Sequence, residues 1–211
     1  EFRPPLSELQ GSFCPLRSLR ELATRYTRLV RPQLRNIVWM SEKIISCTDD
    51  RENGEMTLLV AMLIKANSNE GIDGMILRAI SRFVLHYAPP TDEAVKRAAL
   101  EIIALLPSAF PPSSSPQLLS LFTQRLNDNN QSVITATLEA LKEVLELPLD
   151  DTDEGANPWI GLSDLCPNII ELCSEQLTDR GVEWAEDCSP LEVLVRIGDS
   201  CDALLRPHCD S

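Results

Sequence analysis

Residues 95–106 of the chain read VKRAALEIIALL, and residues 133–144 read VITATLEALKEV. The second segment begins 38 residues after the first, and valine, alanine, leucine and glutamate recur at the same places in both. The matching pairs are Val95 and Val133, Ala98 and Ala136, Leu100 and Leu138, Glu101 and Glu139, Ile103 and Leu141, and Leu106 and Val144. Each segment follows a shorter apolar stretch and a brief polar turn. Self-similarity at a period of this size predicts a stack of helix pairs.

Stacking is favoured because the apolar face of each helix pair is too wide to be buried by that pair alone. The next pair extends the same core, and small residues such as Ala98 and Ala136 let neighbouring helices approach closely. Residues 117–147 resemble a HEAT or armadillo repeat: Leu118, Leu119, Phe122 and Leu126 lie on a first helix, and Asp128 lies in the turn before the second. The resemblance is firm over residues 73–147 and weaker on either side. It implies a right-handed solenoid whose concave face is lined by the second helix of each pair.

The rest of the chain fits an all-α fold of about eight or nine helices, because no stretch alternates between apolar and polar residues at a period of two. Helices are expected at about 16–30, 32–45, 56–66, 73–87, 92–106, 115–126, 131–147, 163–178 and 189–205. Asp92 is an expected N-cap, and the Ser189-Pro190-Leu191-Glu192 run predicts a capping box with proline at the first helical position. We expect an N-terminal extension at 1–14, of which Glu1-Phe2 fits a cloning-site remnant. One repeat domain at 15–206 and a tail at 207–211 follow.

Composition narrows the functional classes. The net charge is −13, but residues 1–48 carry +4 and the remaining residues carry −17. The negative charge of the residues after 48 repels phosphate backbones. Nucleic acid is therefore disfavoured as a partner, and a protein with a basic element is favoured. Seven cysteines with no C-x-x-C spacing are typical of reduced thiols in an intracellular protein of the cytoplasm or nucleus. No apolar run approaches the length of a membrane span.

Catalysis and cofactor binding find little support. His86 and His208 are the two histidines, and His86 lies at an expected helix end, where a capping role is favoured over catalysis. No glycine-rich phosphate loop, G-x-S-x-G or H-E-x-x-H motif occurs. The spacing of the C-terminal cysteines does not suit zinc, and the acidic run at 150–155 does not match a calcium loop. We therefore predict no catalytic residue, no metal and no cofactor.

Two groups of charged residues are candidate binding sites. Glu101 and Glu139 occupy equivalent positions on successive second helices, so they would form adjacent rungs on the concave face. The candidate partner-binding residues are Lys96, Arg97, Glu101, Glu139 and Lys142. The alternative is a basic site on the first two helices, formed by Arg17, Arg20, Arg28, Arg31 and Arg35. Ordinary solvated surface charge explains either group as well.

The first hypothesis is a scaffold domain of a larger intracellular protein, which binds a partner protein through its concave or grooved surface. The alternative is a reader of nucleic acid or of an acidic or phosphorylated ligand through the arginine-rich helices. A tubulin-binding array is disfavoured because an acidic body suits acidic tubulin poorly. An enzyme ranks last.

Overall fold

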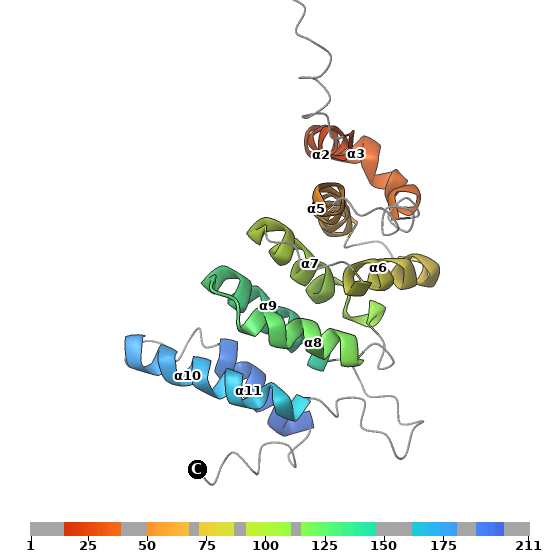
Figure 1. Ribbon diagram of the computed structural model, residues 1–211. Helices are drawn as coiled ribbons and strands as arrows, with labels where there is room; N and C mark the ends of the chain where they lie inside the picture. Colours follow the sequence, from red (N-terminus) through yellow and green to blue (C-terminus); the bar gives the residue numbers. More distant parts are fainter. Residues whose placement is uncertain are drawn as a thin grey trace, which may run out of the picture.

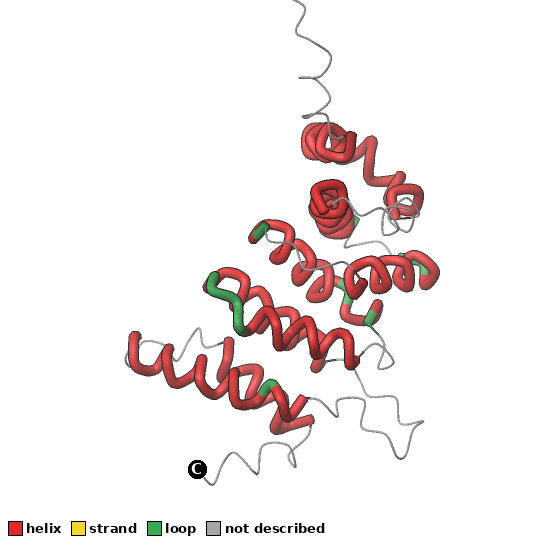
Figure 2. Tube along the Cα trace, viewed as in Figure 1, coloured by secondary structure: helices red, strands yellow, loops and turns green. Residues whose placement is uncertain are grey.

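The computed structural model describes residues 15–38, 50–67, 72–86, 92–110, 115–146, 162–180 and 189–200. Within these ranges the chain is helical and contains no strand, as the absence of period-two alternation predicts (Figure 2). The expected extension at 1–14, the tail at 207–211 and most of the acidic loop at 148–162 lie outside them.

Five helices form one layer, in which each packs against the next. They are α2 (Pro15–Arg25), α5 (Asp50–Ala66), α7 (Glu93–Leu105), α9 (Gln131–Leu145) and α11 (Ser189–Ser200). The contacts run α2 to α5, α5 to α7, α7 to α9 and α9 to α11, so the layer follows the order of the chain (Figure 1). We call it the inner layer. Nine α-helices are described in all, and the predicted helical repeat solenoid is confirmed.

The first helices of the pairs form the second layer. They are α6 (Gly74–His86), α8 (Ser115–Leu126) and α10 (Cys166–Arg180). Before α5, the short helix α3 (Thr27–Val30), the 3-10 turn η1 (Arg31–Gln33) and helical residues 34–38 follow α2. Two further 3-10 turns are η2 (Pro107–Ala109) and η4 (Leu162–Asp164). The core is continuous between the layers, and its largest fully buried side chains include Phe83, Phe110 and Phe122.

The 38-residue offset holds in three dimensions. Three of the matching pairs are buried on both α7 and α9, namely Val95 with Val133, Leu100 with Leu138 and Ile103 with Leu141, and each helix begins at an equivalent cap. Asp92 Oδ1 accepts the backbone N–H of Ala94 at 2.8 Å, and Asn130 Oδ1 accepts that of Ser132 at 2.9 Å. The residues 38 apart therefore share both a buried face and a capping role.

Two of the predicted helix boundaries are wrong. The helix expected at 16–30 breaks at Tyr26, whose backbone leaves the helical region at φ −129° and ψ 49°. In this segment Leu16 is buried, but Leu22, Tyr26 and Leu29 are exposed, whereas Ala23 and Val30 are buried. The helix expected at 56–66 is α5, which instead begins at Asp50. Acidic residues suit the positive end of the helix dipole, so they can begin a helix as well as interrupt one.

Candidate partner-binding groove

Polar side chains link each helix of the inner layer to the next. Arg20 Nε donates to Glu55 Oε2 at 2.7 Å between α2 and α5, and Lys65 Nζ donates to Glu101 Oε1 at 2.7 Å between α5 and α7. Ser132 Oγ donates to Glu93 Oε1 at 2.6 Å between α9 and α7. Between α9 and α11, Lys142 Nζ lies 2.7 Å from Glu192 Oε2, and Arg196 pairs with Glu146. Each described junction is therefore braced at its surface as well as in its core.

The most buried of these braces joins α7 to the turn between α8 and α9. Lys96 Nζ lies 2.7 Å from Asp128 Oδ2, and Arg125 Nη1 lies 4.0 Å from the same oxygen. Asp128 Oδ1 also accepts the backbone N–H of Asn130 at 3.1 Å. The hydrogen bond from Lys96 is the largest effect that lowers the pKa of Asp128, whereas burial lowers the pKa of the Arg125 guanidinium. These charges hold one repeat to the next.

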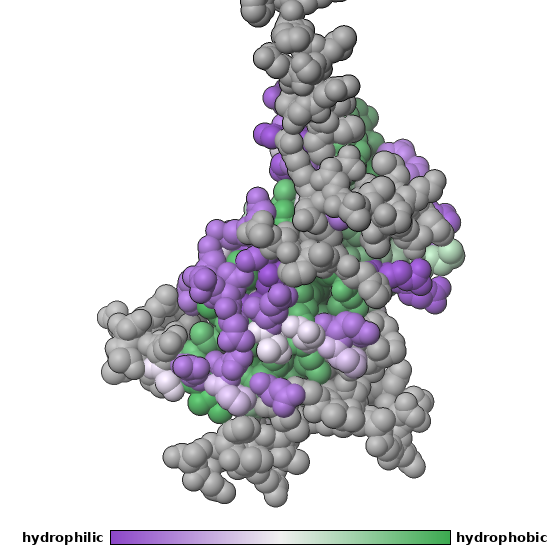
Figure 3. Space-filling model, in the orientation of Figure 1, coloured by the Kyte–Doolittle hydropathy of each residue, from purple (hydrophilic) through white to green (hydrophobic). Residues whose placement is uncertain are grey.

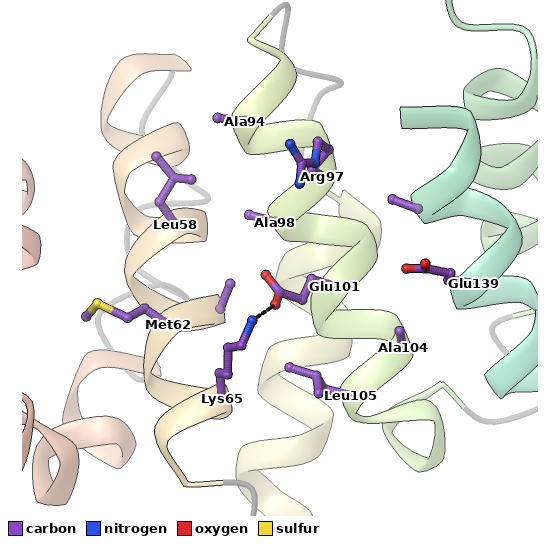
Figure 4. A pocket seen from close by; sticks show the side chains of 12 residues that line it. Leu58, Met62, Lys65, Ala94, Arg97, Ala98, Glu101, Ala104, Leu105 and Glu139 are labelled. Carbon is purple, nitrogen blue, oxygen red and sulfur yellow. Dashed lines mark hydrogen bonds and ion pairs between the residues drawn. The ribbon is translucent and has the colours of Figure 1, made fainter. Parts of the chain in front are cut away.

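A groove of about 620 Å³ crosses three helices of the inner layer, on the side that faces away from the core. Its lining residues are Leu58, Ala61, Met62 and Lys65 of α5; Ala94, Arg97, Ala98, Glu101, Ala104 and Leu105 of α7; and Ala136 and Glu139 of α9 (Figure 4). The floor is mostly apolar because five alanines leave room between larger side chains. On the face shown in Figure 3, hydrophilic side chains cover much of the described surface, and apolar side chains are visible between them.

Four charged residues border the groove, and two of them neutralise each other. Lys65 and Glu101 form an exposed ion pair, and hydrogen bonding to Glu101 raises the pKa of Lys65. Arg97 and Glu139 are exposed and have no ion-pair partner among the described residues. The groove therefore offers one free cation on α7 and one free anion on α9.

The five candidate binding residues divide between two locations. The structure brings Arg97, Glu101 and Glu139 together around the groove, with Glu101 paired to Lys65. Lys96 and Lys142 do not line it, because Lys96 is held by Asp128 and Lys142 by Glu192. A binding role for Arg97, Glu101 and Glu139 stays a prediction.

Sequence reasoning missed the apolar part of the groove. Leu58 and Met62 lie on α5 and are half-buried, and Leu105 ends α7 with 38 % of its surface exposed. Ala94 and Ala104 complete the rim. The sequence could have indicated the groove, because Ala94, Ala98 and Ala104 lie about one and two turns apart on α7. Alanines at this spacing predict a shallow surface when the adjoining helices also carry small residues.

The alternative basic site is partly occupied by internal contacts. Arg17 lies 3.5 Å from Glu21, Arg20 binds Glu55, and Arg31 Nε donates to Asn67 Oδ1 at 2.8 Å. Arg28 and Arg35 are exposed. The described contacts therefore leave two of these five arginines as the clearest candidates for a ligand.

The described residues also include two buried cysteines that form no disulfide. Cys166 and Cys173 are both buried, and burial raises the pKa of the Cys166 thiol. No group of three or more histidine, cysteine, aspartate or glutamate side chains among the described residues is arranged to hold a metal. The side chain of His86 and the C-terminal cysteines lie outside the described residues.

A family model described as "IPO5-like, TPR repeats" matches residues 59–211. The match covers more than half of the chain, including α6 to α11 and the C-terminal part of α5 from residue 59. The chain belongs to the IPO5-like TPR-repeat family. No curated protein and no solved structure matches it. For this IPO5-like chain, the family and the all-helical layers agree with the solenoid that the 38-residue repeat predicts. Among the described residues, no helix is both long and apolar enough to cross a membrane.

Proposed function

We propose that this chain is a protein-interaction scaffold of an intracellular complex and binds a partner protein through the groove across α5, α7 and α9. The observation that carries the proposal is the groove itself: an apolar floor bordered by Arg97 and Glu139, which have no described ion-pair partner. Apolar area provides affinity, and free charges at the rim select the partner and its orientation. Membership of the IPO5-like repeat family supports a scaffold role and gives no support to catalysis.

The partner is expected to be a protein with a basic element. The net charge of −13 favours such an encounter over long range and disfavours nucleic acid. Within the groove, Glu139 is the available carboxylate, because Glu101 is neutralised by Lys65. A membrane surface is not part of the proposal.

The test is quantitative affinity capture from cell extract, with partners measured by mass spectrometry. Ala94→Trp fills the groove from an exposed position, and Glu139→Lys reverses its free anion. Matched controls on the outer layer are Gln117→Trp on α8 and Glu171→Lys on α10, both at exposed positions. All variants must unfold at the wild-type temperature.

A partner that both groove variants lose and both controls retain supports the proposal. Retention by the groove variants contradicts it. If Arg28→Glu with Arg35→Glu abolishes capture instead, and capture falls steeply with added salt, the basic first helices are the site.

A further inference from the structure

A second, smaller hollow of about 190 Å³ shares Leu105 with the groove. Its other lining residues are Ile64, Asn67, Ile72, Leu77, Leu106 and Ser108. The hollow lies where α5 and α7 end and α6 begins. The two spaces adjoin at Leu105, and we call them together the path, which is lined from Ala94 of α7 to Ser108 of η2.

The second hollow suits one bulky apolar side chain. Its walls are mainly aliphatic, and the Asn67 amide is already used: its Oδ1 accepts from Arg31 Nε, and its Nδ2 donates to Leu63 O at 2.7 Å. A dry cavity of about 150 Å³ in another protein admits benzene, so this volume admits a phenylalanine or leucine side chain. A charged group would lose its hydration without gaining a partner there.

The floor of the path favours a helix over an extended segment. An extended chain would press unpaired N–H and C=O groups against Leu58, Met62 and the alanines, where no backbone partner is offered. A helix satisfies its backbone hydrogen bonds internally and needs only an apolar face. The alanines of α7 also permit close approach of a further helix.

The direction of that helix follows from charge. α5 and α7 run side by side in the same direction, with Arg97 near the start of α7 and Leu105 at its end. The free Arg97 guanidinium attracts the negative, C-terminal end of a docked helix. The ends of α5 and α7 beside the second hollow attract its positive, N-terminal end. A helix antiparallel to α7 satisfies both.

The spacing of its residues follows from helix geometry. Arg97 and Leu105 are eight residues apart on α7, since 105 − 97 = 8, which corresponds to roughly 12 Å along the axis. A docked helix has the same rise, so its anchor and its acidic residue are about eight positions apart.

We propose that the groove binds an amphipathic helix of a partner protein, antiparallel to α7, with an apolar anchor in the second hollow and an acidic residue about eight positions later against Arg97. A basic residue one turn before the acidic one faces Glu139. This inference rests on the proposed function and names the chemistry of the partner segment at the same site.

The probe is a fluorescein-labelled stapled helix of about sixteen residues, because shorter free helices are marginal in water. It carries phenylalanine first, leucine four positions later, lysine one position after that and glutamate eight positions after the phenylalanine. A reversed probe exchanges the phenylalanine and the glutamate. Fluorescence anisotropy with the full chain is expected to show binding of the forward probe that is at least about tenfold tighter than that of the reversed probe.

Protein variants test each contact. Arg97→Glu is expected to weaken the forward probe about tenfold, because repulsion replaces attraction, and a probe with arginine in place of its glutamate restores the affinity. Ser108→Phe adds a ring to the lining of the second hollow and is expected to weaken binding by about tenfold or more. The matched controls, Arg78→Glu on α6 and Ser120→Phe on α8, are at exposed positions outside the groove and leave binding unchanged.

Equal affinity of the two probes, or binding that survives Arg97→Glu and Ser108→Phe in folded protein, overturns the inference. No binding of either probe also overturns it. The outcome for the proposed function is separate: a natural partner lost on Ala94→Trp and Glu139→Lys sustains the groove as a binding site even when the probes fail.

Discussion

Asp128→Asn tests the buried brace between repeats most directly. The Asp128 side chain is 11 % exposed and faces Lys96 at 18 % and Arg125 at 5 %. Asparagine keeps the shape of the side chain and the oxygen that accepts the Asn130 N–H, but it removes the negative charge. The ammonium of Lys96 and the guanidinium of Arg125 then lie close together in a poorly hydrated place without a counter-charge.

The expected loss of stability is large for one substitution. Removing one partner from a buried ion pair costs about 3–5 kcal/mol, and the retained hydrogen bond and partial exposure place this case near about 3 kcal/mol. One kcal/mol shifts the Tm of a domain of this size by about 2–4 °C, so the melting temperature falls by about 6–12 °C. The matched control is Asp164→Asn at an exposed position of η4, where the change is expected within about 0.5 kcal/mol.

The stability that ionised Asp128 contributes depends on pH in one predictable direction. The pKa of Asp128 is lowered in the folded chain, chiefly by the hydrogen bond from Lys96, so the folded value lies below the unfolded one. The stabilisation is then fully present above the unfolded pKa of about 4 and is lost as the pH falls through the folded pKa. The difference between wild type and Asp128→Asn should be constant from about pH 7 to 5 and shrink below about pH 4.

Thermal unfolding followed by circular dichroism at a series of pH values measures both quantities. A loss below about 1 kcal/mol at neutral pH would show that Lys96 and Arg125 are not held by this carboxylate. If the stability difference stays constant down to the lowest pH at which both proteins fold, the ionised carboxylate is not the source of the stabilisation.

Three further measurements follow from burial and exposure. Phe122→Ala removes a fully buried ring and should lower the free energy of unfolding by about 3–5 kcal/mol in chemical denaturation. Gln124→Ala, at an exposed position of the same helix, should change it by no more than about 0.5 kcal/mol. Equal losses would contradict the burial of Phe122. Lys65→Met breaks an exposed ion pair and should lower the Tm by only a few degrees, so a loss as large as that of Phe122→Ala would refute its surface role. Iodoacetamide labelling mapped by mass spectrometry should leave Cys166 and Cys173 unmodified in folded protein and modify both in urea, and rapid labelling of folded protein would contradict their burial.

The repeat and its helix starts could be predicted because they depend on local chemistry. Matching residues at 95–106 and 133–144 share burial on α7 and α9, and Asp92 was recognisable as a cap from its position before an apolar period. The break at Tyr26 was not recognisable in the same way. Leucines at helical spacing satisfy the pattern over residues 16–30 whether or not a neighbour covers them, and the structure leaves Leu22 on α2 and Leu29 on α3 exposed.

The site could be predicted only in part because its properties depend on pairs from different helices. Glu101 and Glu139 were candidates because of their equivalent repeat positions and Arg97 because it lies near them, and all three line the groove. Lys96 and Lys142 were equally good candidates in the sequence, but they pair with Asp128 and Glu192 and do not line the groove. Those partners lie 32 and 50 residues away along the chain, beyond the reach of any local pattern.

Glu101 and Glu139 show how one repeat position acquires two roles. Glu101 accepts from Lys65, which lies 36 residues earlier on the preceding inner helix. The residue 36 positions before Glu139 is Ile103, since 139 − 36 = 103, and it is fully buried in the core. No ammonium therefore reaches Glu139 from that place, although Glu139 lines the same groove as Glu101. A glutamate at the same repeat position is therefore paired with a lysine at one helix junction and has no ion-pair partner among the described residues at the next. The repeat determines where the carboxylate lies, and the preceding inner helix determines whether it is available to a partner.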